Sequence, residues 1–115
     1  LEGTEDRLAV SLPYGLQRRL EIARALAAGP RLLLLDEPAA GLTAEERTAL
    51  VALVRRLRTD RELTVVLIEH DMALVFEICE QLVVLDHGEV IGNGVPSDVA
   101  KLPAVVGAYL GAAPP

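Results

Sequence analysis

Apolar runs and apolar stripes alternate along this chain, and their spacing predicts an α/β fold. Three short apolar runs, at residues 32–35, 64–68 and 82–85, have the length and the aliphatic content of buried strands. Residues 16–28 and the segment that starts at Thr43 instead repeat apolar residues every three or four positions, as one face of a helix does. The order of strand, helix and strand predicts a parallel sheet whose strands are covered by helices on both faces.

Short sequence signals mark where the predicted helices begin. Pro13 and Gly15 mark the start of the first helix. Thr43, with Glu46 three residues later, matches the capping box that opens a second helix. Further along the chain, the sequence predicts a short helix at residues 72–79, a hairpin turn at residues 86–88 and short helical pieces beyond Gly94.

Composition restricts the kind of protein that this fold can be. With 115 residues the chain is one domain or part of one, and its core is aliphatic because 51% of the residues are hydrophobic and only 3% are aromatic. The formal net charge of -6 and the scarcity of aromatic rings argue against a nucleic-acid-binding surface. No apolar run approaches the length of a transmembrane helix.

Two adjacent carboxylates, Asp36 and Glu37, directly follow the first apolar run. In an open α/β sheet the carboxyl ends of the strands form the edge where ligands bind, and adjacent carboxylates there are costly unless a cation lies with them. Asp36 is therefore a candidate for holding Mg²⁺, directly or through water, and Glu37 for orienting and deprotonating an attacking water. The alternative is a core strand that runs into an acidic loop, but Pro38 and Gly41 after the doublet favour a nucleotide site.

Two further segments lie at the ends of predicted elements. Residues 12–18 form a glycine-containing turn that opens a helix, and a helix N-terminus offers unpaired N–H groups to a phosphate. Taken alone, this turn favours a purely structural interpretation. His70 ends the strand expected to neighbour Asp36, so its imidazole is a candidate for a hydrogen bond to a γ-phosphate or to the attacking water. The chain contains neither a His-Glu-x-x-His motif nor a Gly-x-Ser-x-Gly motif, so a zinc protease and a serine hydrolase are not indicated.

Three features follow one another along the chain: a glycine turn that opens a helix, a strand that ends in Asp-Glu-Pro and a strand that ends in His. In this order they resemble the ATP-binding subunit of ABC transporters, and the resemblance covers essentially the whole chain. The resemblance implies a partial ABC-type P-loop NTPase fold, with ATP and Mg²⁺ as cofactors. It implies a Walker B Asp36, a catalytic Glu37 and a switch His70. It also implies a signature turn that contacts the ATP of a second subunit, formed by Pro13, Tyr14, Gly15, Leu16 and Gln17. The D-loop that it implies is formed by Ala40, Gly41, Leu42 and Thr43.

Longer stretches resemble one group within that family, the ATPases of bacterial branched-chain amino acid importers. These stretches are residues 12–15, 18–24, 36–42, 68–72 and 108–111. The ATPases of urea or amide importers and of lipopolysaccharide export share parts of the same sequence. Membership of the family is therefore better supported than the identity of the transported solute.

The chain departs from the family pattern in the signature turn and in the D-loop. Pro13 stands where the family has a serine whose hydroxyl contacts the γ-phosphate, and Tyr14 stands where it has a glycine. Thr43 stands where the D-loop usually has aspartate. Backbone N–H groups around Gly15 can still bind a phosphate, whereas the side-chain contribution is weakened.

Residues 1–115 contain no Gly-x-x-x-x-Gly-Lys P-loop, because the only lysine, Lys101, follows Ala100. The chain therefore resembles the C-terminal half of a nucleotide-binding domain, with a signature turn and helix at 1–28, a Walker B, D-loop and switch-histidine core at 29–93, and a C-terminal helical tail at 94–115. We expect the isolated chain to have negligible ATPase activity and to self-associate through unpaired sheet edges. The alternative is a non-catalytic half-domain that acts as an interaction module.

The resemblance also implies partners and a location. ATPases of this family pair head to tail with a second ATPase subunit and bind transmembrane permease subunits, while a solute-binding protein acts indirectly. We therefore expect a peripheral protein at the cytoplasmic face of the bacterial inner membrane, with no nucleic-acid partner.

Overall fold

The computed structural model describes residues 1–109, and the chain divides into two compact units, Leu1–Ile68 and Glu69–Pro115. The first unit contains a 3₁₀ turn (Ala9–Ser11), α1 (Tyr14–Ala27), β1 (Leu32–Asp36), α2 (Ala44–Asp60) and β2 (Thr64–Ile68). The second unit contains α3 (Met72–Ile78), β3 (Leu82–Asp86), β4 (Glu89–Gly94), α4 (Pro96–Val99) and α5 (Pro103–Ala108). The helices and strands predicted from the hydrophobic pattern are therefore confirmed, with small shifts at their ends.

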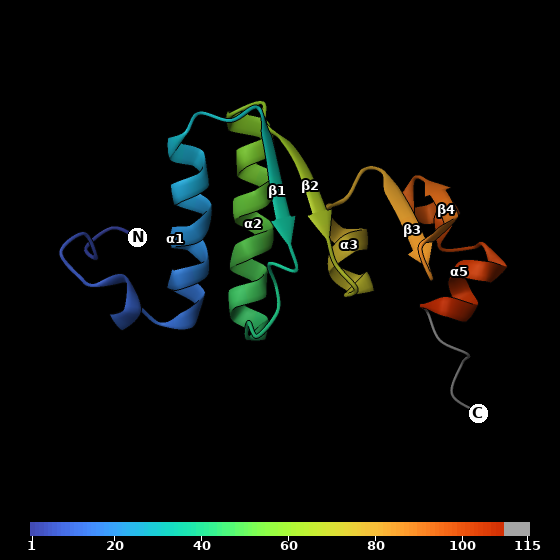
Figure 1. Cartoon of the computed structure of the whole chain (residues 1–115), viewed down its shortest axis with the longest axis horizontal. Helices are drawn as coiled ribbons and strands as arrows, with labels where there is room; N and C mark the ends of the chain where they lie inside the picture. The colour runs from blue at the N-terminus through green and yellow to red at the C-terminus, as the bar shows by residue number, and fades with distance from the viewer. Residues whose placement is uncertain (110–115) are drawn as a thin grey trace. The chain divides into compact units, whose positions relative to one another are not determined.

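The first unit is a two-stranded parallel sheet with helices beside it (Figure 1). β1 pairs with β2 in a register that places Leu33 beside Val65 and Asp36 beside Ile68. α2 connects the two strands and packs on β2, which completes the predicted βαβ unit. In Figure 1 both strands run towards the end of this unit at which α1 and α2 begin. The carboxyl ends of the strands and the N-termini of the two helices therefore lie at the same end.

Only one face of this sheet is buried, which corrects the expectation that helices cover both faces. Leu33 and Leu35 are 3% and 9% exposed, whereas Leu32 and Leu34 are 50% and 68% exposed. Because successive side chains of a strand point to opposite faces, helices packed on one face leave the other in contact with water. We call this second face the open sheet face; it consists of Leu32, Leu34, Val66 and Ile68. Within residues 1–109, the outer edges of β1 and β2 have no further strand partner.

α2 forms where the sequence predicts it because its cap and its apolar stripe agree. Thr43 Oγ1 accepts a hydrogen bond from the Glu46 N–H, and Glu46 Oε1 accepts one from the Thr43 N–H, both at 3.1 Å. This reciprocal pair is the predicted capping box. On the inner side of the helix, Leu50, Val54 and Leu57 are buried at the spacing of a single face.

The second unit is built on an antiparallel hairpin of β3 and β4, with α4 and α5 packed on β4. Its core contains Val84, Val99 and Val105. Gly92 of β4 permits this packing, since a Cβ there would lie 3.0 Å from Val105 Cγ2 and 3.1 Å from Val99 Cγ1. The short helices predicted beyond Gly94 are thus anchored to the hairpin by small apolar contacts.

In the part of the chain that the structure describes, no helix is both long and apolar enough to cross a bilayer. The predicted division at 28/29 and 93/94 stays a prediction. The last two positions of the stretch 108–111, and the end of the predicted tail at 94–115, lie outside the described residues.

Candidate functional site

The carboxyl end of β1 carries the acidic pair that the sequence indicated. Asp36 is the last residue of β1, and Glu37 follows it at the end of the unit where α1 and α2 begin (Figure 1). The backbone N–H of Glu37 donates to the carbonyl oxygen of Ile68 at 2.8 Å, so β2 still holds the first residue beyond the strand. Both residues therefore lie at the sheet edge where α/β proteins bind ligands.

Glu37 adopts a left-handed backbone conformation, with a φ of 46°. This region costs a residue with a side chain roughly 1–2 kcal/mol. The carbonyl oxygen of Glu37 accepts a hydrogen bond from the Ala40 N–H at 3.1 Å, which closes a turn directly after the strand. Glu62, at the opposite end of the sheet, has the same conformation with a φ of 52°. Backbone strain alone therefore does not identify a site, but Glu62 provides a matched control for Glu37.

Both acidic side chains are exposed, which corrects the argument that their burial requires a cation. Water solvates exposed carboxylates, so their position at the sheet edge carries little of the desolvation cost that buried carboxylates would have. The donor set nevertheless fits Mg²⁺, which takes one or two protein carboxylates and fills its other positions with water and phosphate oxygens. Among residues 1–109 no cluster of three or more His, Cys, Asp and Glu side chains is arranged to hold a metal. Asp36 would thus be the protein's contribution to an ion that is otherwise bound by water and a nucleotide.

A positive charge that the sequence analysis did not indicate lies near this pair. Asp36 and Arg18 both line a hollow of about 270 Å³ between α1 and β1. Arg18 Nη1 lies 3.2 Å from Glu21 Oε2, and Arg18 Nε is buried with no hydrogen-bond partner in residues 1–109. Burial lowers the pKa of the Arg18 guanidinium, but the Glu21 carboxylate and the Tyr14 hydroxyl outweigh it and raise that pKa above its ordinary value. Arg18 therefore remains charged beside the hollow.

The predicted signature turn forms the beginning of α1. Pro13 is the N-cap residue, and Tyr14 and Gly15 are the first two helical residues. The N–H groups of Leu16 and Gln17 both donate to the Pro13 carbonyl oxygen, at 2.9 and 3.0 Å. The N–H groups of Tyr14 and Gly15 precede these first intrahelical bonds, so they are the donors that helix geometry leaves for an anion.

Two signature side chains instead bind the protein itself. Gln17 Nε2 donates to the carbonyl oxygen of Leu12 at 2.9 Å and thereby braces the turn. The Tyr14 hydroxyl donates to the carbonyl oxygen of Ala40 at 3.1 Å. Both residues were predicted to contact ATP. The contact of Tyr14 with Ala40 could not be predicted from the local sequence, because its partner is a backbone atom 26 positions away.

Gly15 lies against the capping box of α2. A Cβ at this position would lie 1.8 Å from Glu46 Oε2 and 2.8 Å from Glu46 Cδ. Gly15 is not among the residues with a positive φ. Glycine therefore serves here to leave space for the Glu46 carboxylate and not to give the backbone freedom.

The predicted D-loop residues, Ala40 to Thr43, connect the acidic pair to α2. Gly41 has a φ of 77°, and a Cβ on it would lie 3.1 Å from Tyr14 Cε1. The Leu42 N–H donates to the carbonyl oxygen of Ala39 at 3.2 Å. Leu42 also borders a groove of about 250 Å³ between the first turns of α1 and α2. The signature turn and the predicted D-loop are thus in direct contact, through a hydrogen bond between Tyr14 and Ala40, which are 26 positions apart.

His70 belongs to the second unit, whereas Glu37 belongs to the first. β2 ends at Ile68, so His70 lies in the connection to α3 and not on the strand itself. Asp71 is the N-cap of α3, and its Oδ1 accepts a hydrogen bond from the Leu74 N–H at 3.2 Å. This cap was not predicted, although aspartate before an apolar helical segment is a recognised cap signal. The convergence of Glu37 and His70 on one phosphate stays a prediction.

Three features define the class of protein: the parallel βαβ unit, the acidic pair at the carboxyl end of its first strand, and the glycine turn that opens the preceding helix. A family model described as ABC transporter matches residues 1–40. This chain belongs to the ATP-binding proteins of the ABC transporter family. The family resemblance and the ABC-type fold predicted from the motifs are confirmed.

Individual relatives narrow this class. The chain is 49% identical over 108 residues to BraF, a high-affinity branched-chain amino acid transport ATP-binding protein of Pseudomonas aeruginosa, covering 94% of this chain and 42% of BraF. It is 46% identical over 108 residues to LivG of Escherichia coli, with the same coverage. Among solved structures, the ADP conformation of MJ1267, an ATP-binding cassette of an ABC transporter, aligns with a TM-score of 0.82 and 31% identity over 92% of this chain and 43% of that one. The cbiO1 protein of Clostridium perfringens aligns with a TM-score of 0.82 and 29% identity over 91% of this chain and 42% of that one. The chain therefore spans less than half the length of the relatives that it matches.

Proposed function

We propose that this chain forms the C-terminal half of an ATP-hydrolysing domain in an ABC importer for branched-chain amino acids. The observation that carries the proposal is the exposed Asp36–Glu37 pair at the sheet edge that also holds the first turns of α1 and α2. The similarity to BraF and LivG, whose names specify branched-chain amino acid transport, supports the choice of cargo. Urea, amide or lipopolysaccharide transport remains the alternative within the same chemistry.

In this proposal each residue at the sheet edge has a separate role. Glu37 orients the attacking water and accepts its proton, because a carboxylate just beyond the strand reaches past the edge. Asp36 holds Mg²⁺ through water, and the ion, when bound, neutralises charge on the phosphates. His70 hydrogen-bonds the γ-phosphate of the same nucleotide.

The signature turn and the D-loop serve the other half of a dimer. The N–H groups at Tyr14 and Gly15 contact the ATP held by a second, head-to-tail subunit. The loop at residues 40–43 lies at the same dimer contact. Permease subunits receive the resulting movement, and a solute-binding protein delivers the cargo to them. This assembly places the protein peripherally at the cytoplasmic face of the bacterial inner membrane.

Residues 1–115 alone contain no P-loop, so we propose that they do not turn over ATP by themselves. The direct test is an ATPase assay on two proteins. The first is the 115-residue chain. The second is a chimera in which this chain replaces the matching 108-residue segment of BraF.

Two substitutions in the chimera separate the proposed chemistry from general effects of charge. Glu37→Gln removes the proposed base, and we expect it to lower kcat at least a hundredfold while ATP binding is retained. Glu62→Gln makes the same change at the other glutamate with a positive φ, at the opposite end of the sheet, and should leave kcat within twofold. A chimera that is inactive without substitution, or equally active with Glu37→Gln, would contradict the catalytic proposal and favour a non-catalytic interaction module.

A further inference from the structure

Tyr14 stands where the family signature has a glycine, and its side chain covers the loop that follows β1. Its hydroxyl donates to the Ala40 carbonyl oxygen at 3.1 Å. Its ring atom Cε1 lies 3.1 Å from the place of a Cβ on Gly41. Since Gly41 also has a φ of 77°, the backbone conformation disfavours a side chain there, and the tyrosine ring would have to shift slightly to admit one.

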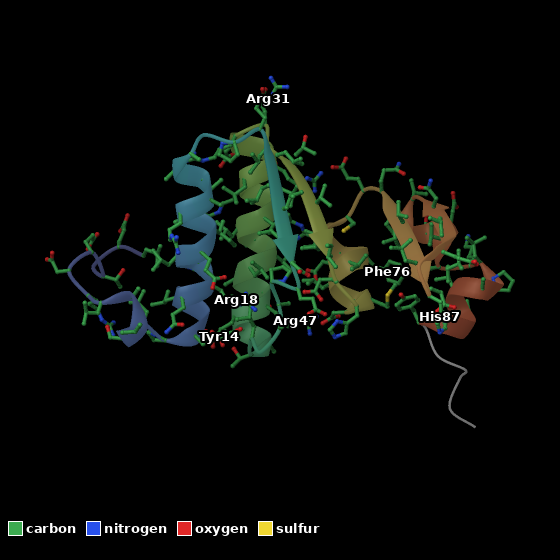
Figure 2. All side chains as sticks on the ribbon, in the orientation of Figure 1. Tyr14, Arg18, Arg31, Arg47, Phe76 and His87 are labelled. Carbon is green, nitrogen blue, oxygen red and sulfur yellow. The ribbon has the colours of Figure 1, made fainter. Side chains whose placement is uncertain are left out.

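The ring is held from its own helix as well. The guanidinium carbon of Arg18, one turn further along α1, lies 5.4 Å from the centroid of the Tyr14 ring, which is within the range of a cation–π contact. Figure 2 shows Tyr14 and Arg18 together on α1 near the beginning of that helix. Arg18 is in turn fixed by Glu21 through the 3.2 Å ion pair. The tyrosine therefore has a defined orientation although 46% of its surface is exposed.

A second contact joins the same two segments. Glu46 approaches Gly15 closely, as described above, and its Oε1 also accepts a hydrogen bond from the Thr43 N–H at 3.1 Å. The first turn of α1 thus contacts the loop at both of its halves, at Ala40 and Gly41 through Tyr14 and at Thr43 through Glu46.

We propose that Tyr14 is a positioning residue that locks the loop at residues 40–43 to the first turn of α1, so that the two segments move as one rigid element. The contact itself is independent of ATP. Its effect on turnover rests on the proposed function, because both segments face the same dimer contact only if the chain works as half of an ABC ATPase. Where the family signature has a flexible glycine, this chain thus has a side chain that connects the first turn of α1 to the loop at residues 40–43.

The contact is tested in the 115-residue chain by Tyr14→Phe, which removes only the hydroxyl. We expect the rate of amide hydrogen exchange at Ala40 and Leu42 to rise about fivefold. This factor corresponds to the loss of roughly 1 kcal/mol, which is what one hydrogen bond contributes. Exchange in the middle of α2 should not change. Tyr109→Phe is the matched control, because the Tyr109 hydroxyl donates to the Leu85 carbonyl oxygen in the second unit. Unchanged exchange at Ala40 and Leu42, or an equal rise throughout residues 1–68, would overturn the proposal.

The effect on turnover is tested in the BraF chimera with the same two variants. We expect Tyr14→Phe to lower kcat about fivefold and to leave the KM for ATP within twofold, because the loop and not the nucleotide loses its contact. A raised KM with an unchanged kcat would instead make Tyr14 a nucleotide-binding residue and overturn the positioning role. Should the unsubstituted chimera be inactive, the proposed function fails, while the exchange experiment still decides whether the contact exists.

Discussion

Replacing Gly15 by alanine places a methyl group where the Glu46 carboxylate lies. The new Cβ would be 1.8 Å from Glu46 Oε2, so the carboxylate must move. Because the obstacle is the end of a flexible side chain, the backbone of α1 stays in place. The cost is the hydrogen bond of 3.1 Å between Glu46 Oε1 and the Thr43 N–H.

A double-mutant cycle compares the free energy of unfolding of the unsubstituted chain, Gly15→Ala, Glu46→Ala and the double variant. Losing the capping hydrogen bond costs about 1 kcal/mol. Alanine in place of glycine in a helix contributes up to about 1 kcal/mol of stability. Gly15→Ala alone should therefore change the free energy of unfolding by less than about 0.5 kcal/mol. Glu46→Ala removes the three atoms that lie nearest to the new methyl group, so in that background the same substitution should stabilise the chain by up to about 1 kcal/mol.

Urea unfolding followed by circular dichroism measures the four free energies, and the coupling between positions 15 and 46 should be about 1 kcal/mol. Gly107→Ala is the control for helix propensity alone, because nothing lies within 4 Å of a Cβ at that glycine of α5. Its effect should be the same with and without Glu46. If Gly15→Ala has the same effect in both backgrounds, to within about 0.3 kcal/mol, then the contact with Glu46 has no energetic weight and the spatial explanation for this glycine is wrong.

Three other predictions follow from burial and capping. Leu33→Ala should lower the free energy of unfolding by about 2–5 kcal/mol and Leu34→Ala by well under half as much, since only Leu33 is buried; equal losses in urea unfolding would contradict burial on one face. Asp71→Ala should remove the cap of α3 at a cost of about 1 kcal/mol and speed amide exchange at Leu74, whereas unchanged exchange would show that the cap contributes nothing. Light scattering at high concentration should detect self-association of the chain through its unpaired sheet edges and its open sheet face, and Leu34→Lys on that face should reduce it; a monomer at all concentrations would refute self-association.

The elements were predictable from the sequence because the forces that define them act over a few residues. Thr43 and Glu46 are three residues apart, and the capping box that they form needs nothing from the rest of the chain. The burial of the strands was not predictable in the same way. An unbroken leucine run looks identical whether one face or both faces are covered, because the pattern reports what a strand can bury and not what is packed on it.

The site shows the same division between local and distant information. The position of Asp36 and Glu37 followed from the end of a strand, and the cap at Asp71 was available from a local signal. The contact between Tyr14 and Ala40 joins residues 26 positions apart, and no local pattern announces it. The left-handed conformation of Glu37 was hidden as well, because glutamate has no preference for that region.

The open sheet face affects how unfolding of this chain must be monitored. Anilinonaphthalene dyes fluoresce on apolar surface that water reaches, and bright emission is ordinarily interpreted as a sign of a loosened interior. Here the native chain already presents aliphatic side chains of Leu32, Leu34, Val66 and Ile68 to the solvent. The dye should therefore be bright on the folded protein and dim as the strands come apart, the reverse of its usual response.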